Sequence, residues 1–190
     1  MIIGLTGPIG SGKSQVAAIW RECGLHVIDC DVVYRELLIT SGALQRDILT
    51  EFPNAETSGQ VDRATLGEIV FNDAAALERL ETVTHPFVTN EVFEIIAGID
   101  GDIVIEAIAL LKSELMKLCD SIVCVIAPPE LRILRVMARD NLTVEQMQAR
   151  LNAQPNDAYY QEKSDYYINN DGTETELRQR AIEILEHCRV

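Results

Sequence analysis

The chain has 190 residues, of which 47% are hydrophobic, and no low-complexity tract, so we exclude a disordered protein and expect one sizeable folded core. Its formal net charge of -14 disfavours binding to nucleic acid or to anionic membranes, because a negative field repels polyanions. No run approaches the roughly 20 apolar residues of a membrane span, and the five cysteines include no Cys-x-x-Cys pair. The sequence therefore predicts a cytoplasmic protein without membrane contact, disulfides or a zinc site.

An apolar run and a helical pattern open the chain. Residues 1–6 predict a short buried strand, and Val16, Ile19 and Trp20 recur at helical spacing before Gly24 ends the helix. The segment between these two elements is therefore expected to form a strand-to-helix turn.

Segment 7–14, which we call the P-loop, reads Gly-Pro-Ile-Gly-Ser-Gly-Lys-Ser and fits the phosphate-binding pattern G-x-x-x-x-G-K-[ST]. Its backbone N–H groups would meet phosphate oxygens at a helix N-terminus, where Lys13 would reach the β- and γ-phosphates and Ser14 would ligate Mg²⁺. A glycine-rich turn that matches by chance is the alternative, and the strand-to-helix setting disfavours it. The predicted nucleotide contacts are Gly10, Ser11, Gly12, Lys13, Ser14 and Gln15.

Two aspartates follow a second predicted strand, residues 26–29. Asp29 and Asp31 fall at the carboxyl end of that strand, where open α/β sheets bind their ligands. If the strand continues to Asp31, both carboxylates share one face, so that Asp31 could accept a proton from an attacking hydroxyl while Asp29 helps Ser14 to hold Mg²⁺. In the alternative, Asp31 only caps a helix that begins near Val32.

Residues 32–100 contain no convincing strand and predict an inserted helical lobe, packed against the sheet. Pro86 follows His85 and predicts the start of a new helix there, since proline suits a first helical turn and disfavours a helix interior. His85 suits a helix-cap or substrate-contact role better than that of a base, because Asp31 lies at a strand end.

Further apolar runs at residues 102–106, 121–126 and 166–169 complete the predicted strands, with helical patterns between them. Such alternation is typical of a parallel sheet covered by helices on both faces. We therefore expect a five-stranded α/β fold that forms a single domain over residues 1–190.

Arginines cluster between residues 132 and 150. Arg132, Arg135 and Arg139 are spaced by three and four along a helix that runs toward Asn141, and Arg150 follows in the next helix. We expect residues 139–155 to form a lid over the nucleotide, with Arg139 and Arg150 facing phosphate. For Arg132 a solvated face paired with neighbouring acidic residues is favoured.

Taken in order over nearly the whole chain, these motifs resemble the dephospho-coenzyme A kinase family. The P-loop and the His85-Pro86 pair are the strongest single matches, and their joint order with the others is specific. The other matching segments are 27–31, Arg35, 62–66, Val70-Phe71, Arg139-Asp140, Arg150 with Gln154, and 165–172.

The resemblance implies a P-loop kinase that uses ATP and Mg²⁺ to phosphorylate the ribose 3′-hydroxyl of dephospho-coenzyme A, the last step of coenzyme A synthesis. It implies that Lys13 and Ser14 hold phosphates and Mg²⁺, that Asp31 is the base for the 3′-hydroxyl, and that Arg139 belongs to the lid. The alternatives are another small P-loop kinase acting on a nucleoside monophosphate or a metabolite, and a nucleotide-dependent switch. The switch is disfavoured because the chain lacks the Asn-Lys-x-Asp motif of guanine-specific switches.

The resemblance also implies where the acceptor and the base of ATP bind. Arg35 and His85 fall where the family binds the acceptor, between sheet and lobe, and Asn170 falls near the adenine. The chain departs from the family at Lys112, where Ala-Leu-Leu-Lys replaces Pro-Leu-Leu followed by an aromatic residue and a glutamate. Lys112 changes the shape and the charge expected of the acceptor loop. Milder departures are Pro8, Gln15 and Tyr34, which stand where the family usually has glycine, threonine and alanine.

Overall fold

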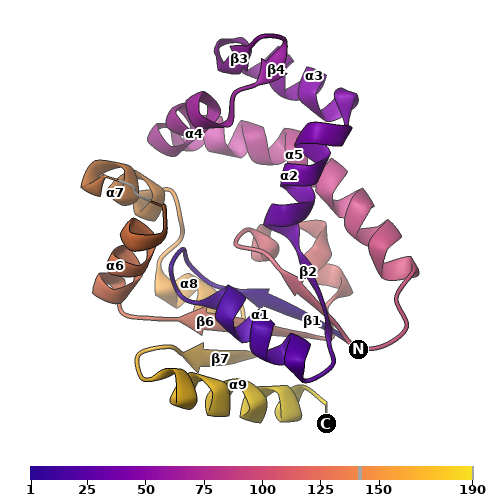
Figure 1. Cartoon of the computed structure of the whole chain (residues 1–190), viewed down its shortest axis with the longest axis vertical. Coiled ribbons are helices and arrows are strands. Elements are labelled where there is room, and N and C mark those ends of the chain that lie inside the picture. Colours follow the sequence, from indigo (N-terminus) through magenta and orange to yellow (C-terminus); the bar gives the residue numbers. More distant parts are fainter. Residues whose placement is uncertain (141–142, 190) are drawn as a thin grey trace.

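The computed structural model describes residues 1–140 and 143–189. Its centre is a five-stranded sheet in the order β2-β5-β1-β6-β7, and every pairing in it is parallel (Figure 1). The α/β prediction is confirmed, and each strand lies within one residue of its predicted span. The strands are β1 (Ile2–Thr6), β2 (His26–Asp29), β5 (Ile103–Glu106), β6 (Ser121–Ile126) and β7 (Tyr166–Asn169).

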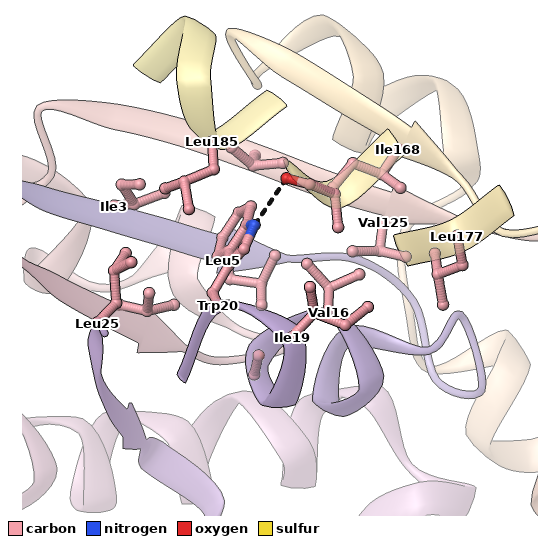
Figure 2. Packing of buried hydrophobic residues seen from close by; sticks show 14 residues of the cluster. Ile3, Leu5, Val16, Ile19, Trp20, Leu25, Val125, Ile168, Leu177 and Leu185 are labelled. Carbon is pink, nitrogen blue, oxygen red and sulfur yellow. Dashed lines mark hydrogen bonds between the residues drawn. The ribbon is translucent and has the colours of Figure 1, made fainter. Parts of the chain in front are cut away.

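One face of the sheet is covered by α1 (Lys13–Glu22) and α9 (Glu174–Cys188), which lie side by side (Figure 1). Figure 2 shows the core between these helices and the sheet, with Trp20 at its centre. The Trp20 ring is fully buried, and its Nε1 donates a hydrogen bond to the Ala181 carbonyl oxygen at 2.8 Å. Gly24 ends α1 with a positive φ of 93°, as the sequence predicted.

A lobe of helices follows β2 and extends beyond that end of the sheet, away from β7 and α9 (Figure 1). Its helices share a core around Leu44, Ile48 and Leu66, separate from the core under α1. A short hairpin of β3 and β4 also belongs to it, which the sequence did not predict. The elements are α2 (Cys30–Thr40), α3 (Gly42–Glu51), the 3₁₀ helix Pro53–Ala55, β3 (Glu56–Thr57), β4 (Gln60–Val61), α4 (Arg63–Asn72) and α5 (Ala74–Ala97).

Pro86 does not begin a helix, contrary to prediction: it lies inside α5, which continues without a break from Ala74 to Ala97. A proline at this position removes one backbone hydrogen bond, at a cost of about 3 kcal/mol. The helix continues because both halves are anchored, Ala76 in the core of the lobe and Val88 and Val92 against the sheet. Tertiary packing thus outweighs the local preference of proline.

Among the remaining helices, α7 faces α4 of the lobe (Figure 1). They are α6 (Pro129–Asp140), α7 (Val144–Asn152) and α8 (Asp157–Glu162), and the 3₁₀ helices Leu110–Lys112 and Glu114–Leu118 follow β5. Of the predicted lid, residues 141–142 lie outside the described residues, and so does the predicted approach of α6 to Asn141. Within the described part of the chain, no helix has both the length and the apolar character needed to cross a membrane.

Candidate active site

The P-loop connects β1 to α1 in a conformation that requires glycine at three positions. Gly7, Gly10 and Gly12 have φ values of 138°, 76° and 99°, in a region that favours glycine. A Cβ at Gly7 would collide with the Val125 carbonyl oxygen, and one at Gly12 with the Asn170 amide. The backbone thus runs close to β6 and to the end of β7, and the motif occupies the predicted strand-to-helix turn.

Lys13 is the first residue of α1, and its side chain is buried under the P-loop. Its Nζ donates hydrogen bonds to the Gly7 carbonyl oxygen at 2.9 Å and to the Pro8 carbonyl oxygen at 3.4 Å. Burial lowers the pKa of Lys13, and the carboxylates of Glu106 and Asp31 oppose this shift. The amino group of Lys13 is therefore held inside the loop that is expected to bind phosphate.

Ser14 donates a hydrogen bond from Oγ to Glu106 Oε1 at 2.7 Å. Glu106 ends β5 and pairs in register with Leu5 of β1 and with Asp29 of β2. Burial raises the pKa of Glu106, which the hydrogen bond from Ser14 opposes. Glu106 was not among the site residues predicted from the sequence. The available signal was its place at the end of an apolar strand, which is also the place of Asp29.

Asp29 and Asp31 do not share a strand. β2 ends at Asp29, whose Oδ1 accepts hydrogen bonds from the backbone N–H groups of Asp31 (2.8 Å) and Val32 (3.1 Å). The condition under which both carboxylates would share one strand face is therefore not met, because an N-cap aspartate starts a helix immediately after it. The cap is Asp29, whereas the alternative assigned this role to Asp31.

Asp31 lies in the first turn of α2 and lines the same cavity as Lys13 and Ser14. Its pKa is raised, first by partial desolvation within the cavity and then by the neighbouring carboxylate of Asp29, while Lys13 lowers it. A raised pKa brings a carboxylate closer to the basicity that proton transfer needs.

The cavity that these residues share measures about 940 Å³, within the usual range for a small-molecule site. It lies between the P-loop, the ends of β2 and β5, the lobe and α7. Six cationic side chains and six carboxylates line it, so the cavity is close to neutral although the whole chain is strongly negative. The cationic residues are Lys13, Arg35, Arg63, Lys112, Arg139 and Arg150.

The two predicted acceptor residues lie in different places. Arg35 lines the main cavity, and its Nε donates a hydrogen bond to the Asp31 carbonyl oxygen at 3.0 Å. His85 lines an adjoining groove of about 800 Å³ between α5 and the 3₁₀ helices, and burial lowers its pKa. Glu81 and Lys112 line both spaces and form an ion pair of 3.4 Å at their junction.

The arginines of α6 have separate partners. Arg139 donates two hydrogen bonds to Asp140, from Nε at 2.6 Å and from a terminal nitrogen at 2.8 Å, and these raise its pKa. Arg132 is only 7% exposed and forms an ion pair of 3.1 Å with Asp157. The solvated face expected for Arg132 is thus wrong, because this side of α6 packs over the P-loop at Gly10.

Asn170 follows β7 and supports the P-loop from behind. Its side chain is almost fully buried, and Nδ2 donates to the Ser11 carbonyl oxygen at 2.8 Å and to Gln15 Oε1 at 3.3 Å. A terminal nitrogen of Arg135 donates to Asn170 Oδ1 at 3.4 Å. The amide of Asn170 is therefore occupied by the loop and α6, and its predicted contact with adenine stays a prediction.

The family model for dephospho-CoA kinase matches residues 1–176. A curated dephospho-CoA kinase from Thermobifida fusca is 38% identical over 188 residues, which cover 97% of this chain and 94% of the relative. A Thermus thermophilus protein of known crystal structure is 32% identical, with a TM-score of 0.84 over 98% of this chain and 96% of its own. A dephospho-CoA kinase structure from Campylobacter jejuni is 28% identical, with a TM-score of 0.64 over 98% of this chain and 96% of its own. This chain therefore belongs to the dephospho-CoA kinase family of ATP-dependent phosphotransferases.

Proposed function

We propose that Lys13, Asp31 and Arg139 carry out the family's reaction in this chain, the transfer of the γ-phosphoryl group of ATP to the ribose 3′-hydroxyl of dephospho-coenzyme A. The observation that carries this assignment is the shared cavity, where all three residues meet the P-loop and Arg35 of the lobe. Formation of ADP that requires dephospho-coenzyme A tests it. A kinase for a nucleoside monophosphate or another metabolite is not favoured, because the family match spans most of the chain.

The residues divide the chemistry between them. Asp31 accepts the proton of the 3′-hydroxyl as that oxygen bonds to the γ-phosphorus, while the bond from the γ-phosphorus to the β,γ-bridging oxygen breaks and ADP leaves. Lys13 and Arg139 neutralise the charge of the transferring group and the leaving oxygen. The P-loop N–H groups and the N-terminus of α1 hold the phosphates in line.

The site also suits Mg²⁺, which commonly takes one or two protein oxygens together with phosphates and waters. Ser14 Oγ and Glu106 Oε1, 2.7 Å apart, offer hard oxygen ligands, and Asp29 lies beside them on the next strand. We assign Ser14 and Glu106 to the ion and Asp29 to its water shell. When bound, the ion would neutralise charge on the β- and γ-phosphates. Among residues 1–140 and 143–189, no three His, Cys, Asp or Glu side chains are grouped to hold a metal by themselves.

Removal of the Arg139 side chain should lower kcat by about 10²-fold with little change in the KM for ATP. Arg139 is 65% exposed and held by Asp140, so it contributes mainly when the phosphoryl group carries transition-state charge. Steady-state kinetics of Arg139→Ala tests this, with Arg46→Ala as the matched control, because Arg46 is exposed on α3. An unchanged kcat would assign Arg139 to the surface.

Lys112 is proposed to meet the diphosphate of the acceptor, because it is the lysine at the junction between the cavity and the groove that contains His85. Lys112→Ala should raise the KM for dephospho-coenzyme A about tenfold and leave the KM for ATP unchanged, since it would remove a charge-assisted hydrogen bond to the acceptor alone. Lys117→Ala is the control, on the adjacent 3₁₀ helix and exposed. Equal effects on both KM values would contradict the assignment.

A further inference from the structure

A contact between the lobe and the lid side involves Arg150 of α7. Its guanidinium carbon lies 4.9 Å from the centroid of the Phe71 ring on α4. Phe71 also lines the cavity in which the acceptor is proposed to bind. An arginine over an aromatic face is attracted by the ring quadrupole, so this pair fixes Arg150 with respect to the lobe.

The same guanidinium reaches a carboxylate that Arg139 also uses. Arg150 forms an ion pair with Asp140 Oδ2 at 3.8 Å, and Arg139 donates to both carboxylate oxygens of Asp140. Asp140 is thus a counter-ion shared by two arginines. Four side chains in contact, Phe71, Arg150, Asp140 and Arg139, lead from the lobe to the arginine assigned to the transferring phosphoryl group; we call them the lobe-to-lid relay.

Because Arg150 also binds Asp140, it affects how firmly Asp140 holds Arg139. To reach a phosphoryl group, Arg139 must exchange its two hydrogen bonds to Asp140 for bonds to phosphate oxygens. Arg150, as a second cation close to Asp140, partly neutralises this carboxylate and repels Arg139. It therefore weakens the attraction between Asp140 and Arg139. The Arg139 side chain is 65% exposed and the Asp140 side chain 25% exposed, so water partly screens this ion pair and a phosphate ligand can compete for Arg139.

We propose that Phe71, Arg150 and Asp140 are positioning residues that couple occupancy of the acceptor lobe to the placement of Arg139 at the transferring phosphoryl group. The proposal rests on the function proposed above. It predicts that dephospho-coenzyme A and ATP strengthen each other's binding through the relay, and such coupling is reciprocal by linkage.

The test measures transfer and coupling in full-length Arg150→Lys and Phe71→Leu. Arg150→Lys keeps a positive charge near Asp140 but loses the planar group over Phe71, and Phe71→Leu keeps an apolar side chain but loses the ring. Each variant should lower kcat roughly tenfold with an unchanged KM for ATP measured at low acceptor. The affinity for AMP-PNP should rise about fivefold on adding dephospho-coenzyme A in the parent chain, and should not rise in the variants.

Arg79→Lys is the matched control, because Arg79 lies 5.8 Å over the Phe52 ring in the same lobe and pairs with Glu51. Arg79 lines neither the cavity nor the groove of His85. Arg79→Lys should leave kcat and the coupling between ATP and dephospho-coenzyme A binding unchanged. A loss in Arg79→Lys equal to that in Arg150→Lys would mean that general loosening of the lobe causes the effect, and would overturn the proposal.

The relay also predicts non-additive effects, since it acts through Arg139. In an Arg139→Ala background, Phe71→Leu should cause no further loss of kcat, whereas independent effects would multiply and overturn the relay. If the parent chain makes no coenzyme A, the proposed function fails first. The same double-mutant cycle on background ATP hydrolysis then still decides the relay, because Arg139 would act on the same phosphoryl group.

Discussion

Replacement of Asp31 by asparagine is expected to lower kcat by about 10⁴-fold while the affinity for ATP changes little. The amide keeps the shape of the side chain but cannot accept the proton of the acceptor hydroxyl. Steady-state kinetics together with AMP-PNP titration measures both quantities. Asp47→Asn is the control, since Asp47 is exposed on α3 and does not line the cavity.

The pH dependence of this effect follows from the raised pKa of Asp31. Only the ionised carboxylate accepts a proton, so kcat in the parent chain should rise with pH until the pH passes this raised pKa. The acidic limb should be absent from the residual activity of Asp31→Asn. A collapse of nucleotide affinity in that variant, or an unchanged kcat, would contradict the role of Asp31 as the base.

Lys13→Ala is expected to lower kcat by about 10³-fold, because it removes a positive charge where the transferring group and the leaving oxygen develop negative charge. Folding should be retained, since desolvation already disfavours the charged form of this buried lysine. Thermal unfolding checks the fold, and an ADP-release assay checks the rate. Lys117→Ala is again the exposed control, and near-normal turnover of Lys13→Ala would refute the role assigned to Lys13.

The sheet was predictable because each strand is a short apolar run bounded by polar or turn residues. In a parallel sheet both faces are buried, so strands such as β6 stand out from the amphipathic helices around them. The P-loop was predictable for a related reason: its glycines, lysine and serine have fixed spacing between a strand and a helix.

The errors arise where long-range packing or a local cap decides the outcome. Pro86 was expected to start a helix, but both ends of α5 are anchored in separate cores, which sequence spacing does not reveal. Asp29 and Asp31 would share a strand face only if β2 continued to Asp31, but the Asp29 cap turns the chain into α2. In both cases the sequence identified the residues, whereas packing or capping determined the backbone around them.

The pairing of strands explains the residues that the sequence could not bring together. Glu106 meets Ser14 only because β5 lies next to β1, although the two residues are 92 positions apart in the chain. Asn170 reaches the P-loop because β7 ends beside β6, which adjoins β1. Sequence patterns identify strand ends, but the strand order decides which ends are neighbours.

The residues of this cavity are proposed to transfer the γ-phosphoryl group of ATP to dephospho-coenzyme A. The most direct test is a coupled assay of ADP formation from Mg-ATP, with and without dephospho-coenzyme A, in which the product is identified by mass. We predict turnover that depends on the acceptor and yields coenzyme A. Background hydrolysis that dephospho-coenzyme A does not stimulate, in folded protein that binds ATP, would contradict the claim.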